Sequence, residues 1–205
     1  MKRRIWIDQD NTIYDLSKPW YGAHNKDYPQ HDLQPEHITG WDTQAVCNAV
    51  GCPADIYSYF NCTELWTDGE VIAGSKKVID MWHKYDMADL GIITTASNAM
   101  SMPYKVEWLQ REFPYIKDIV VNHKTHVKHL LRGDILIDDG IHNLTHWQGI
   151  GILYAQPWNQ GDTGLIRAND WDEVDWLVRR SLVLLDQGYD HKEIESILYL
   201  EGKKK

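Results

Sequence analysis

Short apolar runs that stop at polar residues constrain the fold of this chain more than any other sequence feature. These runs are Arg4–Ile7, Leu90–Thr94, Ile119–Val121, Ile135–Ile137 and Ile150–Tyr154. Consecutive apolar positions in runs too short for a helix are typical of strands buried on both faces of a parallel sheet. Helical spacing of apolar residues appears between and after them, at residues 74–85, 103–113 and 170–178 and through the C-terminal stretch to Leu200.

This alternation predicts an α/β fold, a Rossmann-like three-layer arrangement with a parallel sheet between helices. Residues 14–66 interrupt the alternation, because they contain Pro19, Pro29 and Pro35 and only weak helical periodicity around 43–50. We therefore expect residues 1–13 and 67–205 to form the core. Residues 14–66 would form a small, mainly helical cap inserted after the first strand.

Asp8 and Asp10 follow the first predicted strand. In extended backbone their carboxylates would lie on the same side, because side chains alternate along a strand. Burying like charges together is unfavourable unless a cation neutralises them, and a hard cation such as Mg²⁺ prefers oxygen ligands. A polar turn built on Asp10 and Asn11 is the competing interpretation.

Polar groups also end the later strands, and ligands of open parallel sheets bind beyond these carboxyl ends. Asp138 and Asp139 end the fourth predicted strand, which favours a metal site. Thr95 ends the second, where a hydroxyl beside free N–H groups can hold a phosphate oxygen. Lys124 and Lys128 precede the fourth strand, and either ammonium can neutralise a phosphate and a carboxylate. A helix cap at Thr95 and a solvated basic turn at the lysines are the competing interpretations.

Composition excludes several classes of partner. The formal net charge of −9 disfavours a protein that grips a nucleic-acid polymer, because phosphate backbones need clustered Lys and Arg. No apolar run approaches the roughly 18 residues that a membrane helix requires. Cys47, Cys52 and Cys62 fit no zinc spacing and are expected to be reduced thiols of a cytoplasmic protein. The histidines form no zinc pattern and the glycines no P-loop.

Taken in chain order, these motifs resemble the haloacid dehalogenase superfamily of phosphotransferases: Asp-x-Asp-x-Thr at residues 8–12, then a threonine, a lysine and Asp138-Asp139. More narrowly, the sequence resembles the 5′(3′)-deoxyribonucleotidase family. The narrow resemblance rests on residues 133–139, on the helix with Lys105-x-x-Trp108, and on the strand leading into Pro157-Trp158-Asn159. It covers residues 4 to about 180 and is weakest over residues 14–66.

The chain departs from the family pattern at several positions. Gln9 and Asn11 stand where the family usually has a hydrophobic residue and a glycine. Ala96 replaces a serine that follows the motif threonine, so a hydrogen bond to phosphate is expected to be missing. Gly140 and Ile141 replace a basic or polar residue and a proline.

The motif lysine has two candidates. The family spacing counted back from Asp138 selects Lys128, whereas counting forward from the third strand fits Lys124 better. We favour Lys128 because the segment from there to Asp139 then needs no gap, and Lys124 remains the alternative.

The resemblance implies a Mg²⁺-dependent phosphatase that hydrolyses (deoxy)nucleoside monophosphates. Asp8 would attack phosphorus to form an aspartyl phosphate, and Asp10 would protonate the leaving oxygen and then activate water. Asp8, the backbone carbonyl of Asp10, Asp138 and Asp139 would hold the metal ion.

The phosphoryl group would be bound by Thr95, Lys105 and the motif lysine. Trp41 and Trp66 in the cap are candidates for stacking on the base, and the competing interpretation is that both only fill the cap core. A homodimer fits the family. The tryptophans in helical contexts, Trp82, Trp108, Trp147 and Trp176, are expected in the core.

Two other functions fit the same motifs. One is a phosphatase of the superfamily that acts on another small phosphorylated metabolite, because only the cap would differ. The other is a catalytically degenerate module that binds a nucleotide, which Gln9, Asn11 and Ala96 keep open. A receiver domain has the wrong order of motifs and no place for the insertion.

Overall fold

The computed structural model describes residues 2–49, 51, 55–123 and 127–202, and its centre is a parallel sheet. The sheet has six strands in the order β3-β2-β1-β4-β5-β6. The strands are β1 (Arg4–Ile7), β2 (Asp89–Thr95), β3 (Asp118–Asn122), β4 (Ile135–Asp138), β5 (Ile150–Tyr154) and β6 (Ile166–Ala168). All pairings between neighbours are parallel, so the α/β fold predicted from the sequence is confirmed.

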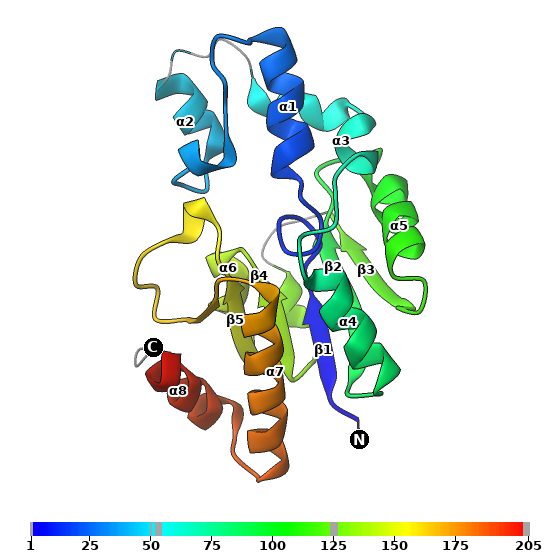
Figure 1. Cartoon of the computed structure of the whole chain (residues 1–205), viewed down its shortest axis with the longest axis vertical. Helices are drawn as coiled ribbons and strands as arrows, with labels where there is room; N and C mark the ends of the chain where they lie inside the picture. Colours follow the sequence, from blue (N-terminus) through cyan, green and yellow to red (C-terminus); the bar gives the residue numbers. More distant parts are fainter. Residues whose placement is uncertain (1, 50, 52–54, 124–126, 203–205) are drawn as a thin grey trace.

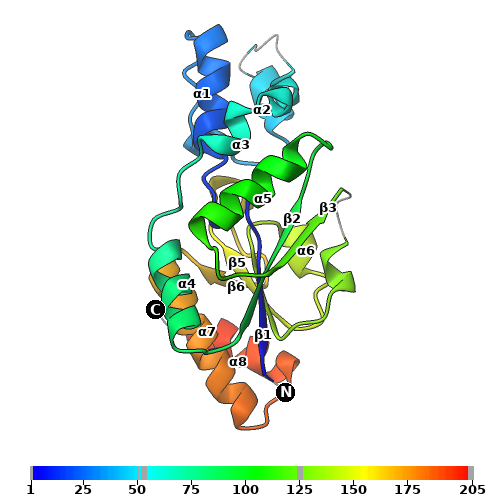
Figure 2. The same ribbon diagram turned by 90° about the vertical axis from the view of Figure 1, so that its right-hand side faces the viewer.

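Helices cover both faces of this sheet (Figures 1 and 2). They are α4 (Ser75–Lys84), α5 (Ser101–Glu112), α6 (Ile141–Leu144), α7 (Trp171–Asp186) and α8 (His191–Gly202), with the short helices η3 (Lys128–Leu130) and η4 (Pro157–Asn159). The larger apolar core joins Ile5, Ile92 and Ile137 of the sheet to α4, α5 and α7. A smaller core on the opposite face contains Trp6 and Leu136 and is closed by α6.

Residues between β1 and α4 form a separate group of helices beyond the carboxyl ends of the strands, at the top of Figure 1. These elements are α1 (Ser17–Asp27), η1 (Pro35–His37), α2 (Thr43–Ala49), η2 (Ile56–Asn61) and α3 (Glu64–Thr67). Two segments connect the group to the sheet. Ile72 N donates to Ile13 O (2.9 Å) and Asp15 N donates to Glu70 O (2.9 Å) where these segments run side by side.

Several local expectations are corrected. The edge strand β6 was not predicted, because it has only three residues and they form no apolar run in the sequence. Helix α5 begins at Ser101, two positions before the predicted start at residue 103. Trp176 was expected in the core, but its side chain is 38% exposed on the outer side of α7, whereas Trp82, Trp108 and Trp147 are buried. Helical context alone did not tell which face of α7 points to the sheet.

Cys47 is buried and Cys62 is a free thiol, whereas Cys52 lies outside the described residues. Within the described part of the chain, no helix combines the length and the apolar character needed to cross a membrane.

Candidate active site

The carboxyl ends of β1 and β4, which pair side by side, bring the acidic motifs together. Asp8 follows β1, and its backbone N–H continues the sheet by donating to Ile137 O at 2.9 Å. Asp138 is the last residue of β4 and is fully buried. Asp139 comes next and is 4% exposed. Parallel pairing therefore places carboxylates from positions 8 and 138–139 at one edge of the sheet.

Lys128 bridges two of these carboxylates. Its Nζ donates to Asp8 Oδ1 and to Asp138 Oδ2, both at 2.6 Å. The lysine is itself 2% exposed and lies in η3, just before β4. Lys124, the other candidate for the motif lysine, lies outside the described residues.

The second oxygen of Asp138 is held by the segment that follows it. Gly140 N donates to Asp138 Oδ1 at 2.8 Å, and Asn143 Nδ2 donates to the same oxygen at 3.0 Å. The side chain of Asp139 is held less firmly than that of Asp138. Its Oδ2 accepts one hydrogen bond among the described residues, from Trp158 Nε1 at 3.1 Å. Its backbone oxygen accepts from Asn159 Nδ2 at 2.8 Å.

Asp8, Asp138 and Asp139 form a cluster suited to a metal ion. One carboxylate oxygen from each of the three lies within 4.8 Å of the others. Among the described residues, one ammonium, that of Lys128, contacts these carboxylates, so ionising all of them leaves an excess of buried negative charge. A hard divalent cation with oxygen ligands would neutralise that excess, and the donor set therefore fits such an ion.

The protonation of the cluster reflects its burial. Burial raises the pKa of Asp8 to about 7, with Asp138 and Asp10 adding to the effect and the Lys128 ammonium opposing it. Burial and the charges of Asp8 and Asp138 raise the pKa of Asp139 well above its usual range. For Lys128, burial lowers the pKa, but the charges of Asp138 and Asp8 outweigh it and the pKa ends above its usual value. The carboxylates thus repel one another and the lysine stays charged.

Asp10 belongs to a second pair beside this cluster. Its Oδ2 accepts a hydrogen bond from the ammonium of Lys105, which is 1% exposed on α5. Lys105 Nζ also donates to Thr94 Oγ1 at 3.1 Å and lies 5.0 Å from the ring centre of Trp66. Asp10 Oδ1 is buried and has no hydrogen-bond partner among the described residues. This oxygen is available to a ligand.

Thr95 ends β2 next to this pair, and its hydroxyl donates to Asn122 Oδ1 at 3.1 Å. Ala96 follows and is fully buried, so no side-chain hydroxyl stands at that position.

A cavity of about 310 Å³ opens from the acidic cluster toward the helices above it. Asp8, Asp10, Thr95, Lys128 and Asp139 line its floor. Its upper wall is aromatic, with Trp20, Tyr21, Trp41, Tyr57, Phe60 and Trp66. An apolar wall facing a charged floor suits a ligand with one anionic end and one flat, weakly polar end.

The two tryptophans singled out from the sequence line this cavity in different ways. Trp66 is buried, and its Nε1 donates to Phe60 O at 3.1 Å. Trp41 is 56% exposed, and its ring lies edge-on to His142 of α6, with 4.6 Å between ring centres. The latter contact joins the upper helices to the segment after Asp139.

Sequence reasoning missed several residues that complete the site. Asn143 and Trp158 hold Asp138 and Asp139, and Trp20 supplies much of the aromatic wall. Asn143 and Trp20 belong to no motif, and Trp158 contributed to the family resemblance without an expected role in the site. The signal available for Trp158 was indirect, since it lies four residues after the end of β5, near the sheet edge where ligands bind in such folds.

Comparisons with known proteins identify the family of this chain. A family model described as "5′ nucleotidase, deoxy (Pyrimidine), cytosolic type C protein" matches residues 2–183. A protein of Bacillus subtilis (strain 168) named 5′(3′)-deoxyribonucleotidase is 32% identical over 179 residues, which cover 85% of this chain and 98% of that protein. A protein of the same name from Clostridium acetobutylicum is 27% identical over 179 residues, covering 84% and 93% respectively.

Solved structures agree on the fold. A haloacid dehalogenase-like hydrolase from Xanthomonas campestris superposes with a TM-score of 0.57 at 15% identity, covering 91% of this chain and 98% of that one. A magnesium-bound hydrolase of the same superfamily from Bacillus subtilis gives a TM-score of 0.56 at 14% identity, covering 86% and 98%. The core of this chain therefore has the haloacid dehalogenase fold.

Proposed function

The chain belongs to the cytosolic type C family of 5′ nucleotidases, and we propose that it is a Mg²⁺-dependent phosphatase that hydrolyses (deoxy)nucleoside monophosphates. The observation that supports this most strongly is the buried cluster of Asp8, Asp138 and Asp139 at the floor of an aromatic cavity. The charged floor suits the phosphate, and the aromatic wall suits the nucleoside.

In the proposed reaction, a carboxylate oxygen of Asp8 attacks phosphorus, and the bond from phosphorus to the nucleoside oxygen breaks. Asp10 gives its proton to that oxygen as the nucleoside leaves. Asp10 then takes a proton from the water that attacks the aspartyl phosphate, releasing phosphate and restoring Asp8. Asp10 Oδ1 is buried and has no hydrogen-bond partner in the part of the chain that the structure describes, which supports this role, because the oxygen can then meet a leaving group or a water molecule.

Mg²⁺ fits the acidic cluster, with Asp8, Asp138 and Asp139 as side-chain ligands and Asp10 contributing its backbone carbonyl. The ion would supply charge neutralisation, so that an anionic carboxylate can approach an anionic phosphate. Asn143 and Gly140 support the proposal, since both hold Asp138 in a fixed orientation from behind.

Lys128, Thr95 and Lys105 are the proposed phosphate-binding residues. The two lysines are buried and each already contacts a catalytic carboxylate, Asp8 or Asp10. Either ammonium can therefore stabilise charge on the phosphoryl group without a large movement. Lys124 remains the alternative to Lys128 and is tested below.

Residues 14–66 are the proposed cap over the nucleoside, with Trp41 and Trp66 as candidates for contact with the base. Residues 1–13 and 67–205 are the proposed core. We further propose that the enzyme acts in the cytoplasm and forms a homodimer, as the resemblance to the 5′(3′)-deoxyribonucleotidase family implies.

Replacing Asp139 by Asn is expected to stabilise the metal-free protein. Burial and the charges of Asp8 and Asp138 disfavour the ionised form of Asp139, so removing this carboxylate relieves repulsion worth about 1–3 kcal/mol of unfolding free energy where it is ionised. The sign follows from the raised pKa values. A carboxyl whose pKa is higher in the folded protein destabilises the fold as pH rises through that range, and protonation removes the penalty at low pH.

Thermal melts with chelator and with Mg²⁺ check this expectation. The wild type should gain stability from Mg²⁺, whereas Asp139→Asn should melt higher in chelator and gain little from the ion. A variant that melts lower in chelator yet keeps the full Mg²⁺ response would remove Asp139 from the metal site.

Replacing Trp41 by Ala is expected to raise KM for nucleoside monophosphates roughly tenfold, as for loss of one base-stacking contact. Because Trp41 is 56% exposed, the variant should fold normally. Tyr85→Ala is the matched control, since Tyr85 is 65% exposed at the end of α4 and far from the cavity. Equal KM values for Trp41→Ala and the control would show that Trp41 does not contact the substrate.

The proposed function is tested by kcat/KM for phosphate release from a panel of deoxyribo- and ribonucleoside monophosphates, sugar phosphates and glycerol phosphates. The highest values are expected for the nucleotides, and only with Mg²⁺. Activity restricted to non-nucleotide esters would replace the substrate class but keep the chemistry. A folded protein that releases phosphate from none of them would be a nucleotide-binding module instead.

A further inference from the structure

Asn11 follows Asp10 in a tight loop and has a left-handed backbone, with φ of 53°. The loop fixes this conformation itself: Asn11 N donates to Tyr14 O at 2.7 Å, and Tyr14 N donates to Gln9 O at 2.9 Å. Glycine adopts such a backbone without strain, and the resemblance leads one to expect glycine here. The backbone therefore does not explain why the chain has asparagine.

The side chain of Asn11 instead reaches the first helix of the 14–66 segment. Its Oδ1 accepts hydrogen bonds from Ser17 N at 3.2 Å and from Ser17 Oγ at 3.0 Å. Ser17 is the first residue of α1 and is 4% exposed, and the apolar Leu16 before it offers no cap. Asn11 thus satisfies an N–H at the helix start that would otherwise lack a partner.

The backbone of Asn11 is held from the opposite side. Gln156 Nε2 donates to Asn11 O at 2.6 Å. Gln156 N in turn donates to Asn159 Oδ1 at 3.0 Å, and Asn159 Nδ2 donates to Asp139 O at 2.8 Å. A continuous set of hydrogen bonds therefore runs from α1 through the loop after Asp10 to the backbone of Asp139.

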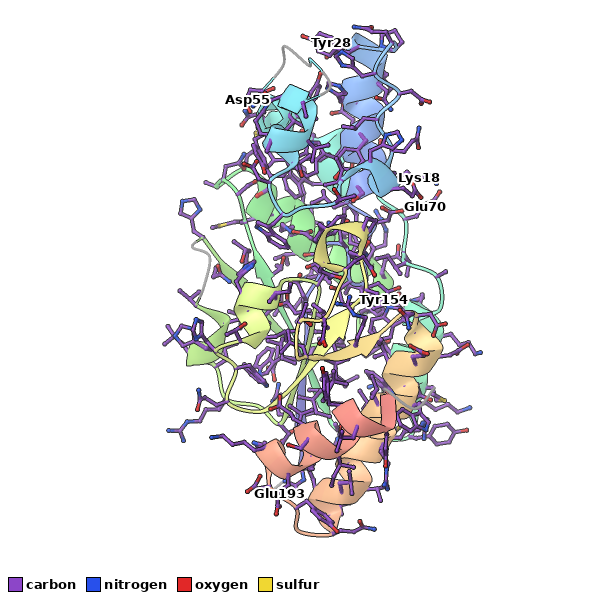
Figure 3. The ribbon with its side chains drawn as sticks, turned by 90° about the vertical axis from the view of Figure 1, so that its left-hand side faces the viewer. Lys18, Tyr28, Asp55, Glu70, Tyr154 and Glu193 are labelled. Atoms are coloured by element: carbon purple, nitrogen blue, oxygen red, sulfur yellow. The ribbon has the colours of Figure 1, made fainter. Side chains whose placement is uncertain are left out.

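This connection matters because α1 forms part of the cavity wall. Trp20 and Tyr21 of α1 line the cavity, and Ser17 begins the same helix. Two more exposed side-chain links join α1 to the connecting segments. Asp15 Oδ1 accepts a hydrogen bond from Lys18 N at 3.1 Å, and the Lys18 ammonium forms an ion pair with Glu70 (2.8 Å), which Figure 3 shows on the outside of the molecule. Both partners of the ion pair are more than half exposed, so solvent weakens it. The part-buried Asn11–Ser17 contact is less exposed than these links and is thus better suited to fix α1.

We propose that Asn11 is a positioning residue that fixes the nucleoside-binding wall of α1 relative to Asp10. The inference rests on the proposed function. A nucleotide held against α1 would then present its leaving oxygen to Asp10 in one geometry. A phosphate ester without a base does not use that wall and does not depend on the connection.

Asn11→Gly tests this inference, because glycine keeps the loop conformation and removes only the side chain. The substrates are a deoxynucleoside 5′-monophosphate and 2-deoxyribose 5-phosphate, which share the leaving oxygen but differ in the base. The expected result is a fall of about tenfold in kcat/KM for the nucleotide and of less than about threefold for the sugar phosphate. Asp32→Gly is the control, since Asp32 is exposed, has the same kind of left-handed backbone with φ of 42°, and lies in the 14–66 segment that contains α1. Its kinetics should match the wild type.

Ser17→Ala, alone and combined with Asn11→Gly, provides the second readout. If the two residues act through their mutual contact, the double variant should lose no more nucleotide activity than Asn11→Gly alone. Any of three results would overturn the inference. They are equal losses of kcat/KM on both substrates, no loss of kcat/KM on the nucleotide, and effects of Asn11→Gly and Ser17→Ala that multiply in the double variant. A wild type that does not hydrolyse the nucleotide would instead overturn the proposed function, and the inference with it.

Discussion

Asp8→Asn is expected to reduce phosphate release from a nucleoside monophosphate by roughly 10⁴-fold or more, the scale seen when a catalytic nucleophile is removed. The amide is similar in size to the carboxylate but cannot attack phosphorus, and it also weakens the metal cluster. The fold should persist, because Lys128 keeps its second partner, Asp138. Steady-state phosphate release with Mg²⁺, at equal concentrations of folded protein, is the measurement.

Asp118→Asn is the matched control for this change. Asp118 is an exposed aspartate at the start of β3, paired with Arg4 at the end of the sheet away from the cavity. Its activity should stay within about twofold of the wild type, as for most surface changes. If Asp8→Asn retained a tenth of the wild-type rate, covalent catalysis by Asp8 would be excluded.

The second large effect is expected for Lys128→Met. Removing the ammonium leaves Asp8 and Asp138 buried without their shared cation, which costs about 3–5 kcal/mol of unfolding free energy in metal-free protein. Activity should also be lost, since the phosphoryl group loses a cation at the nucleophile. Urea unfolding in chelator measures the stability change. Added Mg²⁺ should restore part of it, because the ion supplies positive charge to the same carboxylates.

Lys124→Met distinguishes the two candidates for the motif lysine. If Lys128 is the motif lysine, Lys124→Met should keep most of the activity and the stability of the wild type. The opposite pattern, with Lys124→Met inactive and Lys128→Met stable and active, would assign the role to Lys124.

The sheet and the acidic residues at its edge could be predicted from the sequence, because each depends on a short local pattern of residues. Ile135–Ile137 is an unbroken apolar run followed at once by Asp138, and parallel strands bring such ends together whatever the details of packing. The three-residue edge strand β6 was not accessible, because its identity depends on pairing with β5. The exposure of Trp176 likewise depends on how α7 is rotated against the sheet.

The supporting residues of the site were harder to predict for a similar reason. Asn143 reaches Asp138 only because Gly140 starts a short turn of helix between them. Asn11 reads as a turn residue in sequence, and its contact with Ser17 depends on where α1 begins. The apolar pattern of residues 14–66 is weak, so the start of α1 could not be located without the folded chain. Both contacts are thus consequences of tertiary placement.

The central claim is that the phosphoryl group is transferred from a nucleotide to Asp8. The stereochemical course at phosphorus tests this claim most directly. A nucleoside monophosphate with an isotopically chiral phosphate is hydrolysed in labelled water, and the configuration of the released phosphate is determined. Two successive displacements, first by Asp8 and then by water, predict retention of configuration. Inversion would mean that water attacks the nucleotide directly, and Asp8 would then be a metal ligand without a covalent role.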